Sequence, residues 1–206
     1  MTRRRFLLLA AGAEVGLLLV AVGLGWVWQI PVLAALVPSV AGLVVGGLAI
    51  VPLLGLLWWV TGSGWAPFRR LVSEVDEHLL PLFRACSLPE LALIAAAAGM
   101  GEEALFRGVI QPVVGTMAGI WIGVVVASVF FGLAHLITPT YAVLAGLIGM
   151  YLGALAVFTG GIWAPVVTHA GYDFLALALW VRSPRSPAAD HPEGPPTLRP
   201  GLDDPS

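Results

Sequence analysis

The feature that most limits how this chain can fold is its series of long apolar segments with almost no charge. Hydrophobic residues make up 59% of the 206 residues, and charged residues make up only 11%. Soluble domains are roughly a quarter charged, so the chain departs strongly from that class. A run of about 18 or more apolar residues is long enough to cross a bilayer as a helix. The pattern therefore predicts an all-α, polytopic membrane helical bundle.

The apolar segments give the expected order of helices along the chain. We expect about six transmembrane helices, at residues 6–28, 40–60, 89–113, 117–136, 141–158 and 161–181. Residues 1–60 hold the first two helices, and residues 89–181 form a four-helix region that carries the candidate site. Residues 182–206 are rich in proline and polar residues, so we expect a disordered tail there.

Short signals mark one helix start and two packing positions. Ser87 and Glu90 have the spacing of a capping box, which places the start of the third span at this point. Close helix packing is expected at two G-x-x-x-G pairs, Gly42/Gly46 and Gly149/Gly153.

Residues 61–88 differ from the rest because they contain most of the charges between the spans. Their apolar residues recur at helical spacing, at Phe68, Leu71, Val72, Val75 and Leu79. This periodicity predicts a cytoplasmic or interfacial amphipathic helix that lies on the membrane surface. A docking surface for a soluble partner would produce the same pattern.

The charges also indicate orientation and location. Arginines flank the spans on one side only, at Arg3–Arg5, Arg69, Arg70, Arg84, Arg182 and Arg185. By the positive-inside rule, both termini are expected in the cytoplasm of a bacterium-like cell, with the chain integral to the plasma membrane. We interpret 6–28 as a span rather than as a twin-arginine export signal, because the apolar segment is too long. The net charge of −2 and the absence of a basic patch predict membrane lipid, and no nucleic acid, as a partner.

The ionisable residues of the four-helix region form a small set. Between residues 91 and 181 they are Glu102, Glu103, Arg107, His135, His169 and Asp173. Each costs roughly 2.5 to 3.5 kcal/mol at a helix centre on insertion scales, so their presence is explained most simply by a shared polar cavity. Glu14, inside the first span, is interpreted instead as a carboxylate that faces the bundle interior or reaches toward the interface, without a catalytic role.

The spacings within this set suggest hydrolytic chemistry. Glu103 and Arg107 are four residues apart and can pair on one helix face, which leaves Glu102 free for another role. Two mechanisms remain open. A zinc ion could be bound by Glu102, His135, His169 and Asp173, or Glu102 could act directly as a general base while the histidines stabilise an oxyanion. Ser128 is expected to be a packing residue rather than a nucleophile.

Three motifs in this region resemble those of a known family. Residues 102–107 have the sequence EEALFR, residues 131–135 have FGLAH, and residues 169–173 have HAGYD. They resemble the E-E-x-x-x-R, F-x-x-x-H and H-x-x-x-N/D motifs of the CAAX protease and bacteriocin-processing (CPBP) intramembrane metalloproteases, which include the abortive-infection and CAAX prenyl protease types. The resemblance covers residues 88–177.

The resemblance implies a membrane-embedded peptidase, metallo- or glutamate-dependent, that acts on a membrane-associated peptide or protein. Its catalytic set would be Glu102, Glu103, His135, His169 and Asp173. Glu102 and His135 would activate water, and His169 and Asp173 would serve the oxyanion or a metal site. Glu103 would also form a structural pair with Arg107. The substrate stays open, because a prenylated CAAX protein, a membrane-bound peptide, a bacteriocin precursor and an anchored regulator all fit.

Two other functions and one geometric problem follow from the same residues. Intramembrane carboxylates and histidines also build proton relays, so a proton-coupled transporter is a second hypothesis. A non-catalytic immunity or scaffold protein is a third.

For a peptidase, His135 near the end of the fourth span must meet Glu102, which lies roughly 20 Å along its own helix. We expect them to meet only if the third helix tilts or starts outside the hydrocarbon, with a cavity open to the cytoplasmic side.

Overall fold

The computed structural model describes residues 2–182, and in this part of the chain every regular element is a helix. The all-α prediction is therefore confirmed, whereas the expected disordered tail lies almost entirely outside the described residues. In chain order the helices are α1 (Arg3–Val27), α2 (Val32–Ala35), α3 (Val40–Gly62), α4 (Ala66–Glu74), the π-helical turn η1 (Val75–Leu79), α5 (Leu80–Arg84), α6 (Leu88–Leu105), the π-helical turn η2 (Phe106–Ile110), α7 (Gln111–Ala118), α8 (Ile120–Ala134), α9 (Pro139–Thr159) and α10 (Trp163–Arg182).

The six expected spans are all helical, but not all are long enough to cross a membrane alone. Four helices pass by length and composition, namely α1, α3, α9 and α10, and a fifth span results if the bent pair Ala66–Arg84 and Leu88–Ala118 counts as one. Helix α8 has only 15 residues, about 22 Å at roughly 1.5 Å per residue, whereas the hydrocarbon core is about 30 Å thick. The chain is an integral membrane protein with four to five full-length spans rather than six.

Local sequence signals explain where several helices begin. The Ser87 hydroxyl and the Glu90 carboxylate form the expected capping box at the start of α6, and the Ser87 backbone N–H donates to Glu90 at 2.8 Å. Arg3 forms an ion pair with Glu90, which ties the start of α1 to the start of α6. The Thr138 hydroxyl accepts from the Tyr141 backbone N–H and caps α9, whose first residue is a proline.

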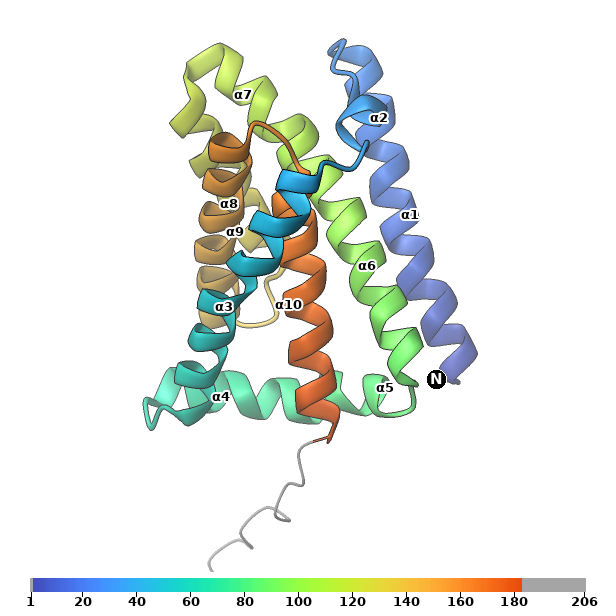
Figure 1. Cartoon of the computed structure of the whole chain (residues 1–206). Helices are drawn as coiled ribbons and strands as arrows, with labels where there is room; N and C mark the ends of the chain where they lie inside the picture. The colour runs from blue at the N-terminus through green and yellow to red at the C-terminus, as the bar shows by residue number, and fades with distance from the viewer. Residues whose placement is uncertain (1, 183–206) are drawn as a thin grey trace, which may run out of the picture.

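Helix α10 lies at the centre of the bundle, between α3 and α6, while α1 packs on the outer side of α6 and α8 packs with α9 (Figure 1). The Gly42/Gly46 pair allows the α3–α10 contact, as expected. A Cβ added at Gly46 would lie 2.6 Å from the Ala164 carbonyl oxygen, so only glycine permits this approach. Thr168 of α10 donates a hydrogen bond to the Gly46 carbonyl at 3.0 Å across the same interface.

The segment from α4 to α5 lies across one end of the bundle (Figure 1), and the chain bends by 117° between it and the helices that follow. Its apolar face is buried through Phe68 and Leu71, which cluster with Val60 of α3. Near the other end of this segment, Asp76 accepts a hydrogen bond of 2.7 Å from the indole N–H of Trp180 in α10. The segment is therefore attached to both α3 and α10.

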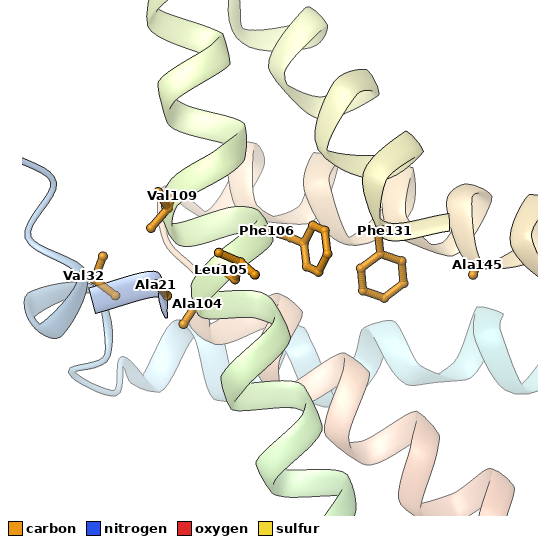
Figure 2. Packing of buried hydrophobic residues seen from close by; sticks show 8 residues of the cluster. All are labelled: Ala21, Val32, Ala104, Leu105, Phe106, Val109, Phe131 and Ala145. Atoms are coloured by element: carbon orange, nitrogen blue, oxygen red, sulfur yellow. The ribbon is translucent and has the colours of Figure 1, made fainter. Parts of the chain in front are cut away.

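A second apolar cluster joins α1, α6 and α8. Figure 2 shows the rings of Phe106 and Phe131 facing each other between α6–η2 and α8, with their centroids 5.1 Å apart. The cluster fixes the distance between the helices that carry the ionisable residues. Its buried members are Ala21, Val32, Ala104, Leu105, Phe106, Val109, Phe131 and Ala145.

Candidate active site

The two consecutive glutamates of α6 occupy different environments. Glu103 is fully buried, whereas Glu102 keeps 9% of its surface exposed. Successive residues of a helix point about 100° apart, so the two side chains face different neighbours. Helix α6 then passes into the π-helical turn η2, and π-helical turns are frequent at functional sites.

Glu103 is the centre of a buried network that joins three helices. One of its carboxylate oxygens accepts a hydrogen bond of 2.9 Å from Arg107 and lies 2.8 Å from Nδ1 of His169. The second terminal nitrogen of Arg107 donates to the Gly149 carbonyl of α9 at 2.9 Å. The side chains of Glu103 and Arg107 are both fully buried. A charge pair of this kind is tolerated in a membrane interior because each charge has a partner.

Phe131 connects this network to the second half of the site. The Arg107 guanidinium lies 4.5 Å from the centroid of the Phe131 ring, which is a cation–π distance. The His135 ring stacks on the same phenylalanine, with 4.5 Å between the centroids. The aromatic residue of the F-x-x-x-H motif therefore holds the histidine of that motif in place.

His135 directly follows the last residue of α8 and faces Glu102. Its Nδ1 lies 2.8 Å from the Phe131 carbonyl oxygen, and its Nε2 lies 3.6 Å from a carboxylate oxygen of Glu102. When Nδ1–H donates to that carbonyl, Nε2 is directed at Glu102. The Glu102 oxygen itself is buried and accepts no hydrogen bond from any described residue. Buried acceptors of this kind are uncommon and point to a bound molecule or a catalytic role.

The short length of α8 explains how His135 and Glu102 meet. Helix α8 has 15 residues and His135 directly follows it, while Glu102 lies in the last turn of α6, so the two side chains meet where these helix ends come together. The expected tilt of the third helix, or its start outside the hydrocarbon, stays a prediction. Sequence hydropathy does not give the end of α8 because residues 135–138 continue the apolar segment.

His169 is held between two carboxylates. Its Nδ1 contacts Glu103, and its Nε2 lies 3.4 Å from a carboxylate oxygen of Asp173, one turn further along α10. Only an imidazolium can donate from both nitrogens, so this arrangement favours a positive charge at His169. The Asp173 side chain is one-third exposed, which makes it the most accessible of the six ionisable groups.

A cavity of about 130 Å³ lies beside these groups. His135, His169 and Asp173 form its polar end, and Tyr141 and Tyr172 lie near them. The remaining walls are apolar and come from α3, α4, η1, α9 and α10, including Leu53, Leu57, Val60, Leu71, Val72, Val75, Leu144 and Ile148. The site is therefore a small apolar cavity with a polar end.

The four expected zinc ligands do not surround a common point. His169 directs both ring nitrogens at Glu103 and Asp173, and Glu102 pairs with His135 instead. Among residues 2–182, no three His, Cys, Asp or Glu side chains are arranged to hold a metal ion. The side chains as placed do not fit a tetrahedral zinc site. Zinc binding remains a prediction for direct measurement.

The structure brings all six ionisable residues of the four-helix region together, and it adds groups that were not expected. Gln111 donates to the Gly153 carbonyl at 3.1 Å, as Arg107 does to Gly149. The donors Arg107 and Gln111 are four residues apart, and so are the acceptors Gly149 and Gly153. This equal spacing is the sequence feature that could have predicted the second hydrogen bond. Ser128 donates to the Val124 carbonyl at 2.6 Å and is buried, which agrees with the expected packing role.

The comparisons with known proteins agree with this geometry. A family model described as type II CAAX prenyl endopeptidase Rce1-like matches residues 84–175. That segment contains all six ionisable residues described above and excludes α1 to α4. No curated protein and no solved structure matches the chain. Residues 84–175 of this membrane protein are therefore similar to Rce1-like type II CAAX prenyl endopeptidases, which agrees with the resemblance of the three motifs.

Proposed function

We propose that the protein is an intramembrane endopeptidase that hydrolyses a peptide bond in a membrane-associated protein or peptide, with water activated at Glu102 and His135. The observation that carries the proposal is the meeting of these two side chains, from α6 and the end of α8, at 3.6 Å, with His135 lining the cavity. The Rce1-like match supports CAAX-type endopeptidase activity in general.

In the proposed reaction, Glu102 acts first as a base and then as an acid. Its free carboxylate oxygen accepts a proton from water as the water oxygen forms a bond to the scissile carbonyl carbon. The carbonyl oxygen becomes an oxyanion. When the C–N bond breaks, the proton held by Glu102 passes to the leaving amine, and the carboxylate is regenerated. His135 orients the water because its ring is fixed by the Phe131 carbonyl.

His169 is proposed to supply positive charge for the oxyanion. Both N–H groups of His169 face carboxylates, so its Nε2–H, which is 3.4 Å from Asp173, would turn from Asp173 to the oxyanion while Nδ1–H stays on Glu103. Asp173 is placed at the cavity, where it contributes by orienting His169. Glu103 and Arg107 act indirectly, because they hold His169 and Phe131 in position.

The proposed substrate enters from the end of the bundle at which α4 to α5 lies. The chain starts at this end, and α10 finishes there (Figure 1). The arginines that flank the spans gather at the same end, so we propose that it faces the cytoplasm. A prenylated CAAX peptide is the first substrate to test, because the matching family is described as a prenyl endopeptidase.

Cleavage of a fluorogenic farnesylated CAAX peptide by the purified full-length protein in proteoliposomes tests this proposal. Wild-type protein should cleave the peptide, and Glu102→Gln should not. Glu77→Gln is the matched control, since Glu77 is exposed on the interfacial segment and should cleave like wild type. An unprenylated transmembrane peptide should be tested in parallel. Wild-type protein that cleaves neither peptide would contradict the proposal and favour a transporter or scaffold.

A further inference from the structure

Glu14 of α1 lies outside the matched segment, yet it reaches the candidate site. Helix α1 crosses α6 at Gly101, the residue directly before Glu102. A Cβ added at Gly101 would lie 2.5 Å from the Glu14 carbonyl oxygen and 3.2 Å from the carboxylate oxygen Oε2 of Glu14. Glycine at this position therefore allows both the backbone and the carboxylate of Glu14 to approach α6 next to Glu102.

The carboxylate of Glu14 is directed into the protein. Its Oε2 atom is inaccessible to solvent and has no hydrogen-bond partner among residues 2–182. The neighbouring residue Val15 is 53% exposed on the outer surface of α1, so α1 presents one side to lipid and Glu14 to the site.

The alternative, a carboxylate that reaches the membrane surface, does not explain this placement. Glu14 lies about 16 Å from the start of α1 at roughly 1.5 Å per residue, far from either surface. The arginine at the start of α1 pairs with Glu90 and not with Glu14. A carboxylate at this depth is costly unless water or a polar group satisfies it, and the ionisable residue next to its contact point on α6 is Glu102.

We propose that Glu14 is a further catalytic residue, which holds the attacking water together with Glu102. This inference rests on the proposed peptidase function. Buried carboxylate oxygens that accept no hydrogen bond from the described residues occur at Glu14, Glu102 and Glu103, and the proposal rests on the contact of Glu14 with α6 at Gly101, directly before Glu102. Glu102 is nine-tenths buried, so its free oxygen is not satisfied by open solvent.

Two acceptors on one water molecule have a defined chemical effect. The water donates one hydrogen to each carboxylate, which leaves its lone pairs free to attack a carbonyl carbon. Glu102 takes its hydrogen as a proton when the new C–O bond forms, whereas Glu14 keeps its hydrogen bond to the hydroxyl that is now attached to carbon. Without Glu14, the water would bind less often in the attacking orientation, so the proposal predicts a loss in kcat larger than any change in KM.

Cysteine accessibility tests the placement without any assay of activity. In a Cys86→Ser background the chain has no other cysteine, so single variants Glu14→Cys and Val15→Cys can be treated with a small water-soluble methanethiosulfonate in proteoliposomes. Glu14 is partly exposed as a residue although its Oε2 atom is not, so the expected result is slow modification at position 14 and none at position 15, which faces lipid. Gly64→Cys, exposed between α3 and α4, is the positive control. Equal lack of modification at positions 14 and 15 would overturn the proposal.

Kinetics of three further variants test the catalytic role. Glu14→Gln should lower kcat by roughly 10- to 100-fold with KM within about 3-fold, and Glu14→Asp should recover part of the loss. Val15→Ala should cleave like wild type. If wild type cleaves and Glu102→Gln does not, but Glu14→Gln matches wild type, the inference about Glu14 is wrong while the proposed function stands. If wild type cleaves no peptide, the proposed function fails and the role of Glu14 fails with it.

Discussion

Two regions of the site, built around neighbouring glutamates of one helix, differ in almost every physical respect. Around Glu103, one carboxylate oxygen contacts both Arg107 and His169 at less than 3 Å, the other accepts no hydrogen bond from residues 2–182, and the side chains of Glu103 and Arg107 are fully buried. Around Glu102, neither oxygen has a contact this short, and the nearest cation candidate, His135, is 3.6 Å away with a quarter of its side chain exposed. We propose that the first region serves mainly stability and the second serves chemistry.

The difference shows that residue type does not decide the role of an intramembrane carboxylate. Unpaired polar atoms cost free energy, so a fold retains them where a ligand or a reaction uses them. Glu102 and Glu103 have the same side chain, and they differ only by about 100° of helix rotation. Substitutions in the two regions should therefore separate loss of stability from loss of activity.

The largest expected effect is on the stability of the paired region. Arg107→Ala removes one partner of a fully buried pair and should lower the free energy of unfolding by about 3–5 kcal/mol. Arg107→Lys should lose less, because it keeps the charge. Unfolding in mixed detergent micelles with increasing SDS measures both. A change below about 1 kcal/mol for Arg107→Ala would show that the pair is not structural.

In the second region, the effect should fall on activity. His135→Ala should reduce kcat/KM by roughly 10²- to 10⁴-fold, since a group that orients and activates the water is lost. Its unfolding free energy should stay within about 1 kcal/mol of wild type, because the ring is partly exposed. Peptide cleavage and SDS unfolding of the same sample check the two halves of this prediction. If His135→Ala lost as much unfolding free energy as activity, the proposed distinction between the Glu102 region and the Glu103 region would be wrong.

A glycine supports the paired region from one turn away. A Cβ added at Gly99 would lie 2.9 Å from the Ala170 side chain and 3.0 Å from two backbone atoms of α10. Gly99→Ala should therefore push α10 away from α6, weaken the contact between Glu103 and His169, and cost about 1–3 kcal/mol. Gly47→Ala is the control, because nothing lies within 4 Å of its added Cβ, and it should be neutral or stabilising.

No effect is expected from metal removal. Because the described side chains do not converge on a common point, purified active protein should contain well under about one zinc per chain, and EDTA should leave cleavage unchanged. Elemental analysis of wild type beside His135→Ala and His169→Ala measures this. About one zinc per chain that is lost in both variants would establish the metal site and replace the direct role of Glu102.

The sequence was sufficient to predict the helical class and the six ionisable residues of the site. Their cost in hydrocarbon makes each of Glu102, His135 and Asp173 conspicuous, and the i to i+4 spacing identified the pair of Glu103 with Arg107. The capping box at Ser87 was likewise predictable, because it depends on residues three apart. These features are local or concern charges in an apolar chain.

Features that depend on helix crossing could not be predicted in the same way. Hydropathy did not show that α8 ends at Ala134, because His135 lies in a continuous apolar stretch. The proposed role of Glu14 depends on the point where α1 crosses α6 at Gly101, and no periodicity gives that point. Phe131 was predicted only as part of the F-x-x-x-H motif, and its contacts with both Arg107 and His135 depend on how α8 packs.

The most direct test of the central claim is a comparison of Glu102→Gln with Glu103→Gln, measuring peptide cleavage and unfolding for each. Glu102→Gln should lose cleavage by about 10³-fold or more and unfold like wild type. Glu103→Gln should unfold about 3–5 kcal/mol more easily, because Arg107 would be left buried without its counter-charge. Equal behaviour of the two variants, or cleavage retained in Glu102→Gln, would contradict the division of the site into a stabilising and a reactive region.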